Sequence, residues 1–154
     1  MSKELTPERL VGLGFRGWMS GYDLHDLSCW EAVWDTYACA LGPKKAKRVV
    51  GNLSTWVRAT RKASCRTIET LPLACSGFTS DERIAVSIIA ACQIENCPAL
   101  NACAFALLGT PHVDPMVREA RDFANLLAEF DCRVPPAAIG HFGGQAVATK
   151  HLSN

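Results

Sequence analysis

The sequence has no hydrophobic run long enough to cross a bilayer and no apolar leader at its start. Polar residues and a proline break its most apolar region, residues 84–108, into two pieces of about a dozen residues, and a spanning helix needs about 20. The first ten residues, MSKELTPERL, contain neither the apolar core nor the cleavage site of a secretory signal. These absences predict a cytoplasmic protein that does not act on a membrane.

Strand signals and the common site motifs are also missing. No CxxC or HxxxH spacing occurs, and the glycine-rich stretch GHFGGQ lacks the lysine and hydroxyl residue of a phosphate loop. No nucleophile can be matched with a nearby base from the sequence alone. We therefore expect a non-enzymatic protein with no catalytic residue and no cofactor.

Eight cysteines are present, which is a high number for 154 residues. A disulfide framework normally belongs to shorter secreted chains, whereas most of these cysteines are flanked by Ala, Leu and Ile. Free cysteine is commonly a small buried residue in such surroundings. The cysteines are therefore predicted to be mainly reduced core residues.

Helix signals are dense along the chain. Thr6 precedes a proline at a helix start, Ser28 and Glu31 have the spacing of a capping box, and so do Thr79 and Glu82. The pattern predicts an all-α fold, an irregular bundle of about six helices, in a single domain at residues 1–133 with a loosely attached tail at 134–154. The predicted helices span about residues 7–20, 28–42, 43–64, 79–94, 97–109 and 114–130.

Two of these helices have further apolar patterns. Trp30, Trp34, Tyr37 and Leu41 repeat at spacings of 4, 3 and 4, so we expect them along one buried side of the second helix. The last helix carries a similar stripe of five residues, which is expected to pack on the core of its own chain. Arg118 and Asp122 are expected to pair on its outer side. The stripe residues are Met116, Ala120, Phe123, Leu127 and Phe130.

Positive charge is concentrated in one segment. Residues 42–66 carry eight lysines and arginines and no carboxylate, although the net charge of the whole chain is only +1. At 100° per residue, seven positions fall on an apolar arc, and six cations fall on the opposite arc. The apolar positions are Ala46, Val49, Val50, Leu53, Trp56, Val57 and Thr60, and the cations are Lys44, Lys47, Arg48, Arg58, Arg61 and Lys62.

The six cations, here called the cationic face, are the candidate partner-binding residues. A merely solvated helix usually mixes charges of both signs, so a one-sided strip favours an anionic macromolecule, either nucleic acid or an acidic protein surface. The leading hypothesis is a small regulatory or adaptor protein that binds such a partner. The alternative is a self-associating structural protein, a homo-oligomer whose basic helix is neutralised by its own acidic helices, because the segments on both sides are net acidic.

A third hypothesis is a metal-binding protein or enzyme that uses the region around His25 and Cys29. The segment YDLHDLSCWE holds residue types that suit zinc, and these two residues would share a face if both were helical. The spacing matches no zinc pattern, and capping by Ser28 and Glu31 already explains part of the cluster. No metal site is therefore predicted, and His25 and Cys29 are its only weak candidates.

Overall fold

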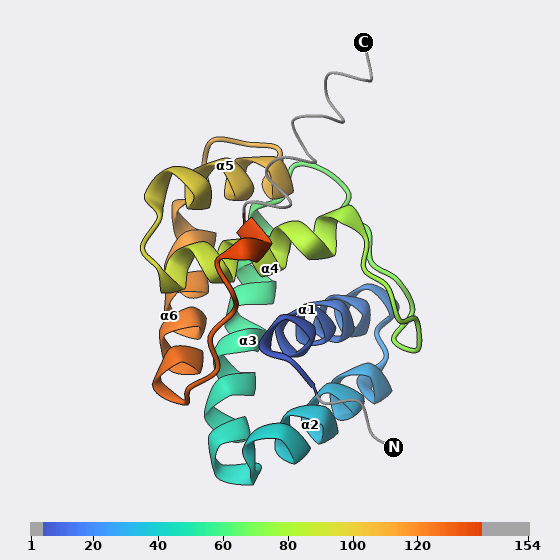
Figure 1. The fold of residues 1–154 in the computed structure, drawn as a ribbon. Coiled ribbons are helices and arrows are strands. Elements are labelled where there is room, and N and C mark those ends of the chain that lie inside the picture. The colour runs from blue at the N-terminus through green and yellow to red at the C-terminus, as the bar shows by residue number, and fades with distance from the viewer. Residues whose placement is uncertain (1–4, 140–154) are drawn as a thin grey trace.

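The computed structural model describes residues 5–139, and within them six substantial helices and no strand occur. The predicted all-α single body is confirmed (Figure 1). None of the described helices is both long and apolar enough to cross a membrane. The helices are α1 (Pro7–Leu24), α2 (Leu27–Leu41), α3 (Pro43–Ala63), α4 (Ser80–Gln93), α5 (Cys97–Leu108) and α6 (Asp114–Glu129).

The predicted helix starts are confirmed except at α2. Thr6 accepts a hydrogen bond from the backbone N–H of Arg9, and Thr79 and Glu82 form a complete capping box. At α2 the cap is Asp26, whose carboxylate accepts from the Ser28 backbone N–H at 2.9 Å. The predicted cap, Ser28, lies inside the first turn, because α2 begins two residues earlier than its sequence signal indicates.

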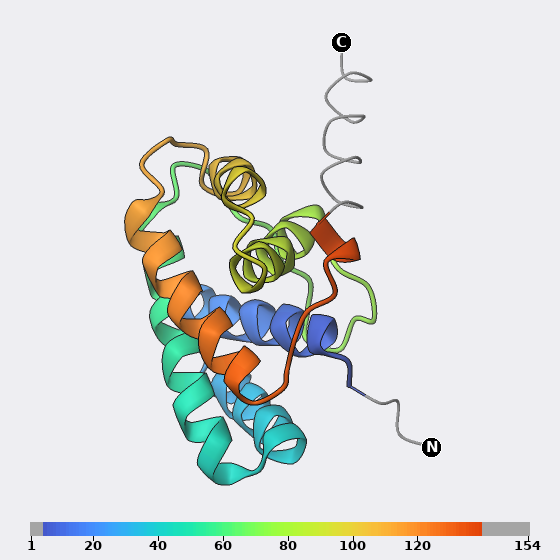
Figure 2. The ribbon, with the colours of Figure 1, turned by 60° about the vertical axis from the view of Figure 1, so that its left-hand side comes forward.

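The helices α1, α2 and α3 contact one another, and α6 connects α3 to α4 (Figures 1 and 2). α1 is central and contacts α2, α3 and α4, while α5 packs on α4 at the end of the molecule opposite α2. α3 and α6 lie side by side in both views. They run antiparallel, since Arg48 near the start of α3 meets Glu129 at the end of α6, and Lys62 lies beside Pro115.

Trp56 of α3 is at the centre of the core. Its ring is fully buried between Phe15 of α1 and Phe123 of α6, with ring centroids 5.3 and 5.4 Å away. Aromatic contacts at this distance add to the free energy gained by burying the rings. All seven positions predicted for the apolar arc of α3 are buried, which confirms the helical projection.

The packing of α1 against α2 depends on glycines. A Cβ on Gly14 would lie 2.2 Å from the Tyr37 hydroxyl, and one on Gly21 would lie 2.1 Å from the Trp30 indole nitrogen. The Tyr37 hydroxyl uses this space to donate a 2.6 Å hydrogen bond to the carbonyl of Leu10. Any larger residue at either glycine would therefore displace the Tyr37 or the Trp30 side chain from its position against α1.

The buried side of α2 differs from the predicted one. Only Cys29, Val33 and Tyr37 are buried, at a spacing of four residues, whereas Trp34 is 36% exposed. The aromatic repeat misplaced the buried arc because Trp30 packs at its edge, stacked on Trp18 of α1 with centroids 5.1 Å apart. α2 therefore presents much of its surface to solvent.

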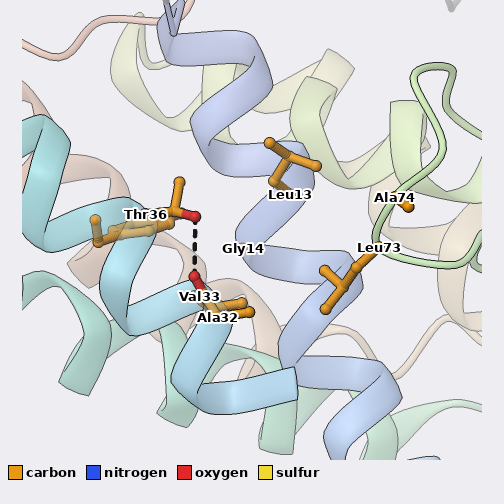
Figure 3. Close-up of a pocket in the computed structure, with 8 residues that line it drawn as sticks. Leu13, Gly14, Ala32, Val33, Thr36, Leu73 and Ala74 are labelled. Atoms are coloured by element: carbon orange, nitrogen blue, oxygen red, sulfur yellow. Dashed lines mark hydrogen bonds between the residues drawn. The ribbon is translucent and has the colours of Figure 1, made fainter. Parts of the chain in front are cut away.

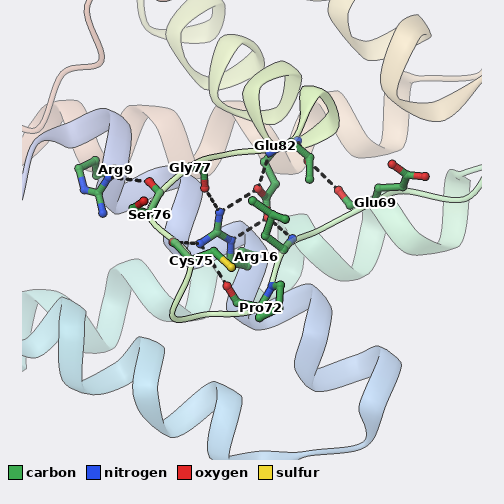
Figure 4. Close-up of polar contacts among 10 residues, drawn as sticks. Arg9, Arg16, Glu69, Pro72, Cys75, Ser76, Gly77 and Glu82 are labelled. Atoms are coloured by element: carbon green, nitrogen blue, oxygen red, sulfur yellow. Dashed lines mark hydrogen bonds and ion pairs between the residues drawn. The ribbon is translucent and has the colours of Figure 1, made fainter.

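The connection between α3 and α4 is held by a buried arginine (Figure 4). The Arg16 guanidinium, which is fully buried, donates to both carboxylate oxygens of Glu82 and to the carbonyls of Cys75 and Gly77. Glu82 also accepts from the backbone N–H of Leu71. The loop between α3 and α4 thus has no regular secondary structure but is fixed by side chains of α1 and α4.

The last helix and the segment that follows it also pack on the core. The predicted stripe of α6 is buried from Met116 to Leu127, and Phe130 is partly buried at its end. Val134, the first residue of the predicted tail, is 2% exposed, and its N–H donates to the Gln93 side chain at 2.7 Å. Residues 140–154 of that tail lie outside the described residues.

Candidate interaction surface on helix α3

The cationic face of α3 points to solvent. All six of its residues are exposed, whereas every apolar-arc position of the same helix is buried. α3 is therefore amphipathic in the fold, and the six charges are available to a molecule approaching from outside. They are Lys44, Lys47, Arg48, Arg58, Arg61 and Lys62.

Two of the six cations are paired with carboxylates of the same chain. Arg61 forms an ion pair with Asp23 at the end of α1, and Arg48 lies 3.9 Å from Glu129 of α6. Both pairs are solvent exposed, where such contacts contribute little free energy. Among residues 5–139, no carboxylate comes within ion-pair distance of the other four cations.

Aromatic rings orient part of the cationic face. The Arg61 guanidinium lies 5.3 Å from the centroid of the Tyr22 ring, and Arg58 donates to the Tyr22 hydroxyl at 3.5 Å. Partial burial raises the pKa of Tyr22, but its hydrogen bonds with Arg58 and Ser54 outweigh this, so that the pKa lies below its ordinary value. The same contact raises the pKa of Arg58. Tyr22 therefore holds two of the cations near one another.

A groove lies between the C-terminal half of α3 and the start of α6. Its volume is about 590 Å³. Ala59, Ala63 and Pro115 provide apolar lining, and Arg58 and Lys62 of the cationic face line it as well. The remaining lining residues are Thr55, Cys65, Thr110, His112, Arg118 and Glu119.

Arg118 is a third cation on this groove, and the sequence did not assign it to a site. It was expected to pair with Asp122 one turn along α6, but no ion pair joins the two residues in the described part of the chain. Arg118 instead lines the groove with Arg58 and Lys62. Only the antiparallel packing of α6 on α3 brings these cations together, so no local sequence pattern could have indicated it.

The two weak metal candidates differ in their exposure to solvent. His25 is the exposed C-terminal cap of α1, with a left-handed backbone (φ 52°), whereas Cys29 is buried in α2. Burial raises the pKa of the Cys29 thiol, and the nearby Asp26 carboxylate raises it further. Within residues 5–139, no group of three or more His, Cys, Asp or Glu side chains could hold a metal ion.

The cysteines are all free, but they are not mainly core residues as predicted. Cys29, Cys92 and Cys132 are buried and Cys103 is half-buried, whereas the other four are exposed. Apolar neighbours in sequence do not distinguish the two groups, because a helix places adjacent residues on different faces. The exposed ones are Cys39, Cys65, Cys75 and Cys97.

A second cavity, of about 310 Å³, lies between α1, α2 and the anchored loop (Figure 3). It is lined by Leu13, Val33 and Leu73 among others, and none of its lining residues is ionisable except the buried Tyr37. Its Thr36 hydroxyl donates to the carbonyl of Ala32 in the same helix. This cavity therefore offers little polar chemistry to a ligand, unlike the groove beside α3.

Comparisons with known proteins assign no function to this surface. No family model, curated protein or solved structure matches the chain. A function for the protein has to be argued from its own geometry and charge.

Proposed function

We propose that the protein is a small non-enzymatic regulatory or adaptor protein, and that it binds an acidic protein surface through the cationic face of α3. The observation that carries the proposal is the separation of charged and apolar residues on α3, where six exposed cations lie opposite seven buried apolar-arc positions. Exposed like charges on one face repel one another, and an anionic partner would relieve that repulsion.

An acidic protein fits this face better than a nucleic acid does. Carboxylates border the cations, with Asp23 at the end of α1 and Glu119 and Glu129 on α6. A phosphate backbone is anionic along its whole length and would meet these carboxylates, whereas a protein surface carries both signs and apolar side chains. The apolar lining of the neighbouring groove favours a protein partner for the same reason.

Titrations with labelled anionic probes test the proposal. An acidic peptide that mixes glutamate with leucine and a few lysines, a DNA duplex and a single-stranded RNA are each titrated with the protein at low and high salt. We expect the peptide to bind in a salt-sensitive manner, because exposed charges are screened by ions. Stronger binding of either nucleic acid, with a steep dependence on salt, would contradict the protein-partner assignment.

Matched charge reversals locate the binding surface. Arg58→Glu with Lys62→Glu should weaken peptide binding about tenfold or more, a loss of about 1.4 kcal/mol or more. Arg121→Glu with Arg133→Glu changes net charge equally at two exposed positions that are not part of the cationic face, and should have a much smaller effect. Equal losses in the two variants would mean that net charge alone, rather than this face, attracts the probe.

A further inference from the structure

Helix α2 exposes a face that is both apolar and acidic. Leu24 just before it and Leu27 at its start are 67% and 65% exposed, and Trp34 is 36% exposed. Glu31 and Asp35 are exposed beside them, and within residues 5–139 neither takes part in an ion pair. We call Leu24, Leu27, Glu31, Trp34 and Asp35 the α2 face.

No lysine or arginine lies between Arg16 and Lys44, so the α2 face contains no cation. Large apolar side chains that gather on the surface, rather than being scattered singly, commonly mark a site of protein association. The fold leaves Leu24 and Leu27 mostly exposed and Trp34 partly exposed, and α2 buries only Cys29, Val33 and Tyr37. The α2 face therefore has the composition of an interface with a cationic, partly apolar partner.

The groove beside α3 has the complementary composition. The groove is lined by three cations and by a single carboxylate. The cations are Arg58, Lys62 and Arg118, and the carboxylate is that of Glu119. Between these charges lie Ala59 and other small or apolar residues, which leave room for larger side chains. The groove could therefore receive exposed leucine and tryptophan side chains while its cations meet carboxylates.

The spacing of the charges also agrees. Glu31 and Asp35 are four residues apart on α2, and Arg58 and Lys62 are four residues apart on α3. In both helices this separation corresponds to one turn, a rise of about 6 Å. Two helices placed side by side can thus form both carboxylate–cation contacts at once. The same turn of α2 carries Trp34, and the same turn of α3 carries Ala59, so apolar contact is available next to the charges.

We propose that the protein self-associates, with the α2 face of one copy bound in the α3–α6 groove of a second copy. The two surfaces are distinct, so two copies can exchange both contacts in a symmetric dimer, or many copies can associate head to tail. This inference goes beyond the proposed function, because the α2 face has no role there. The self-contact uses Arg58 and Lys62, and therefore competes with an external acidic partner for part of the cationic face.

Sedimentation velocity measures the association directly. The wild-type protein, kept reduced, should form dimers or larger species whose fraction rises with protein concentration and falls with salt. Glu31→Lys with Asp35→Lys reverses the α2 face at two exposed positions and should weaken association about tenfold or more. A wild-type protein that is monomeric at every concentration and salt would overturn the proposal.

Mixing two variants provides the decisive test. The α2 reversal and the groove reversal, Arg58→Glu with Lys62→Glu, should each be monomeric, because each places like charges in contact. An equimolar mixture should associate again, since both contacts are then between opposite charges. Monomers in the mixture, from variants that circular dichroism shows to be folded, would exclude this pairing of surfaces.

The α2 reversal also separates this inference from the proposed function. The acidic peptide should bind this variant at least as well as it binds the wild-type protein, because the cationic face of the variant is intact and freed from the self-contact. Weaker binding of the peptide by the α2 reversal would contradict the competition described above. Loss of self-association alone leaves the external binding function standing, and the two proposals can therefore fail independently.

Discussion

The Arg16 guanidinium and the Glu82 carboxylate form an ion pair with no exposed side-chain surface, with Nε and Oε2 2.8 Å apart. Arg16 also donates to backbone carbonyls of the loop between α3 and α4. A charge buried in this way is stable only while its partner is ionised and in contact. The pair is therefore a point at which a single substitution should have a large effect.

Glu82→Gln is expected to lower the free energy of unfolding by about 3–5 kcal/mol, because it leaves the Arg16 charge buried without its counterion. Arg48→Gln, which removes the exposed pair with Glu129, should change it by about 1 kcal/mol or less. Urea unfolding monitored by circular dichroism measures both values. Similar small losses of unfolding free energy in the two variants would mean that water hydrates the Arg16 guanidinium in the folded protein.

Substituting two glycines by alanine should have opposite effects on stability. Gly14→Ala places a methyl group 2.2 Å from the Tyr37 hydroxyl and should destabilise the protein by about 1–3 kcal/mol. Gly51→Ala, on the exposed side of α3 with open space around it, should stabilise the protein by about 0.5–1 kcal/mol. Thermal unfolding checks both. A neutral Gly14→Ala variant would show that α1 and α2 can separate without loss.

Stability should fall in alkaline solution because of the buried thiols. Burial raises the pKa of Cys92 from 9.0 to about 12, and it also raises the pKa values of Cys103 and Cys132. Between pH 9 and the folded pKa of Cys92, the unfolded chain releases a proton that the folded chain retains. The contribution of this thiol is thus fully present below pH 9 and is lost above it, by about 1.4 kcal/mol per pH unit at most.

The urea midpoint of the wild-type protein should therefore decline more steeply above pH 9 than that of Cys92→Ala. All other titrating groups are shared by the two proteins, so the difference between their slopes isolates this thiol. Parallel slopes would show that Cys92 is hydrated in the folded protein.

Thiol alkylation should divide the eight cysteines by exposure. Cys39, Cys65, Cys75 and Cys97 are expected to react in the native, reduced protein well before the buried Cys29, Cys92 and Cys132. Mass spectrometry of digested samples identifies the modified sites, and unfolding in urea should make all eight reactive. Early modification of a buried cysteine in native conditions would indicate local opening of its helix.

The sequence predicts the fold well where a signal is local and periodic. The apolar arc of α3 and the capping box at Thr79 were read correctly, because each depends on residues within a few turns of one another. The buried face of α2 was misplaced, since Trp30 packs on Trp18 of α1, which lies in another helix.

The candidate site was predictable only in part, for the same reason. The six cations and their exposure follow from helical projection. Arg118 lines the groove because α6 packs on α3. The apolar positions of α6 predict that one side of this helix is buried, but they do not indicate which helix it packs against. The sequence does not predict the burial of Arg16, because a buried arginine can be identified only from the carboxylate and carbonyl groups that surround it in the fold.

The anchoring of the loop at Arg16 has a further consequence for the order in which the chain folds. The partners of Arg16 lie 56 to 66 residues further along the sequence, and they come from both the loop and α4. Contacts this distant require a large part of the chain to be closed first, and such closure slows folding. The connection between α3 and α4 should thus become ordered only when α1 and α4 dock, as a late and cooperative event of folding.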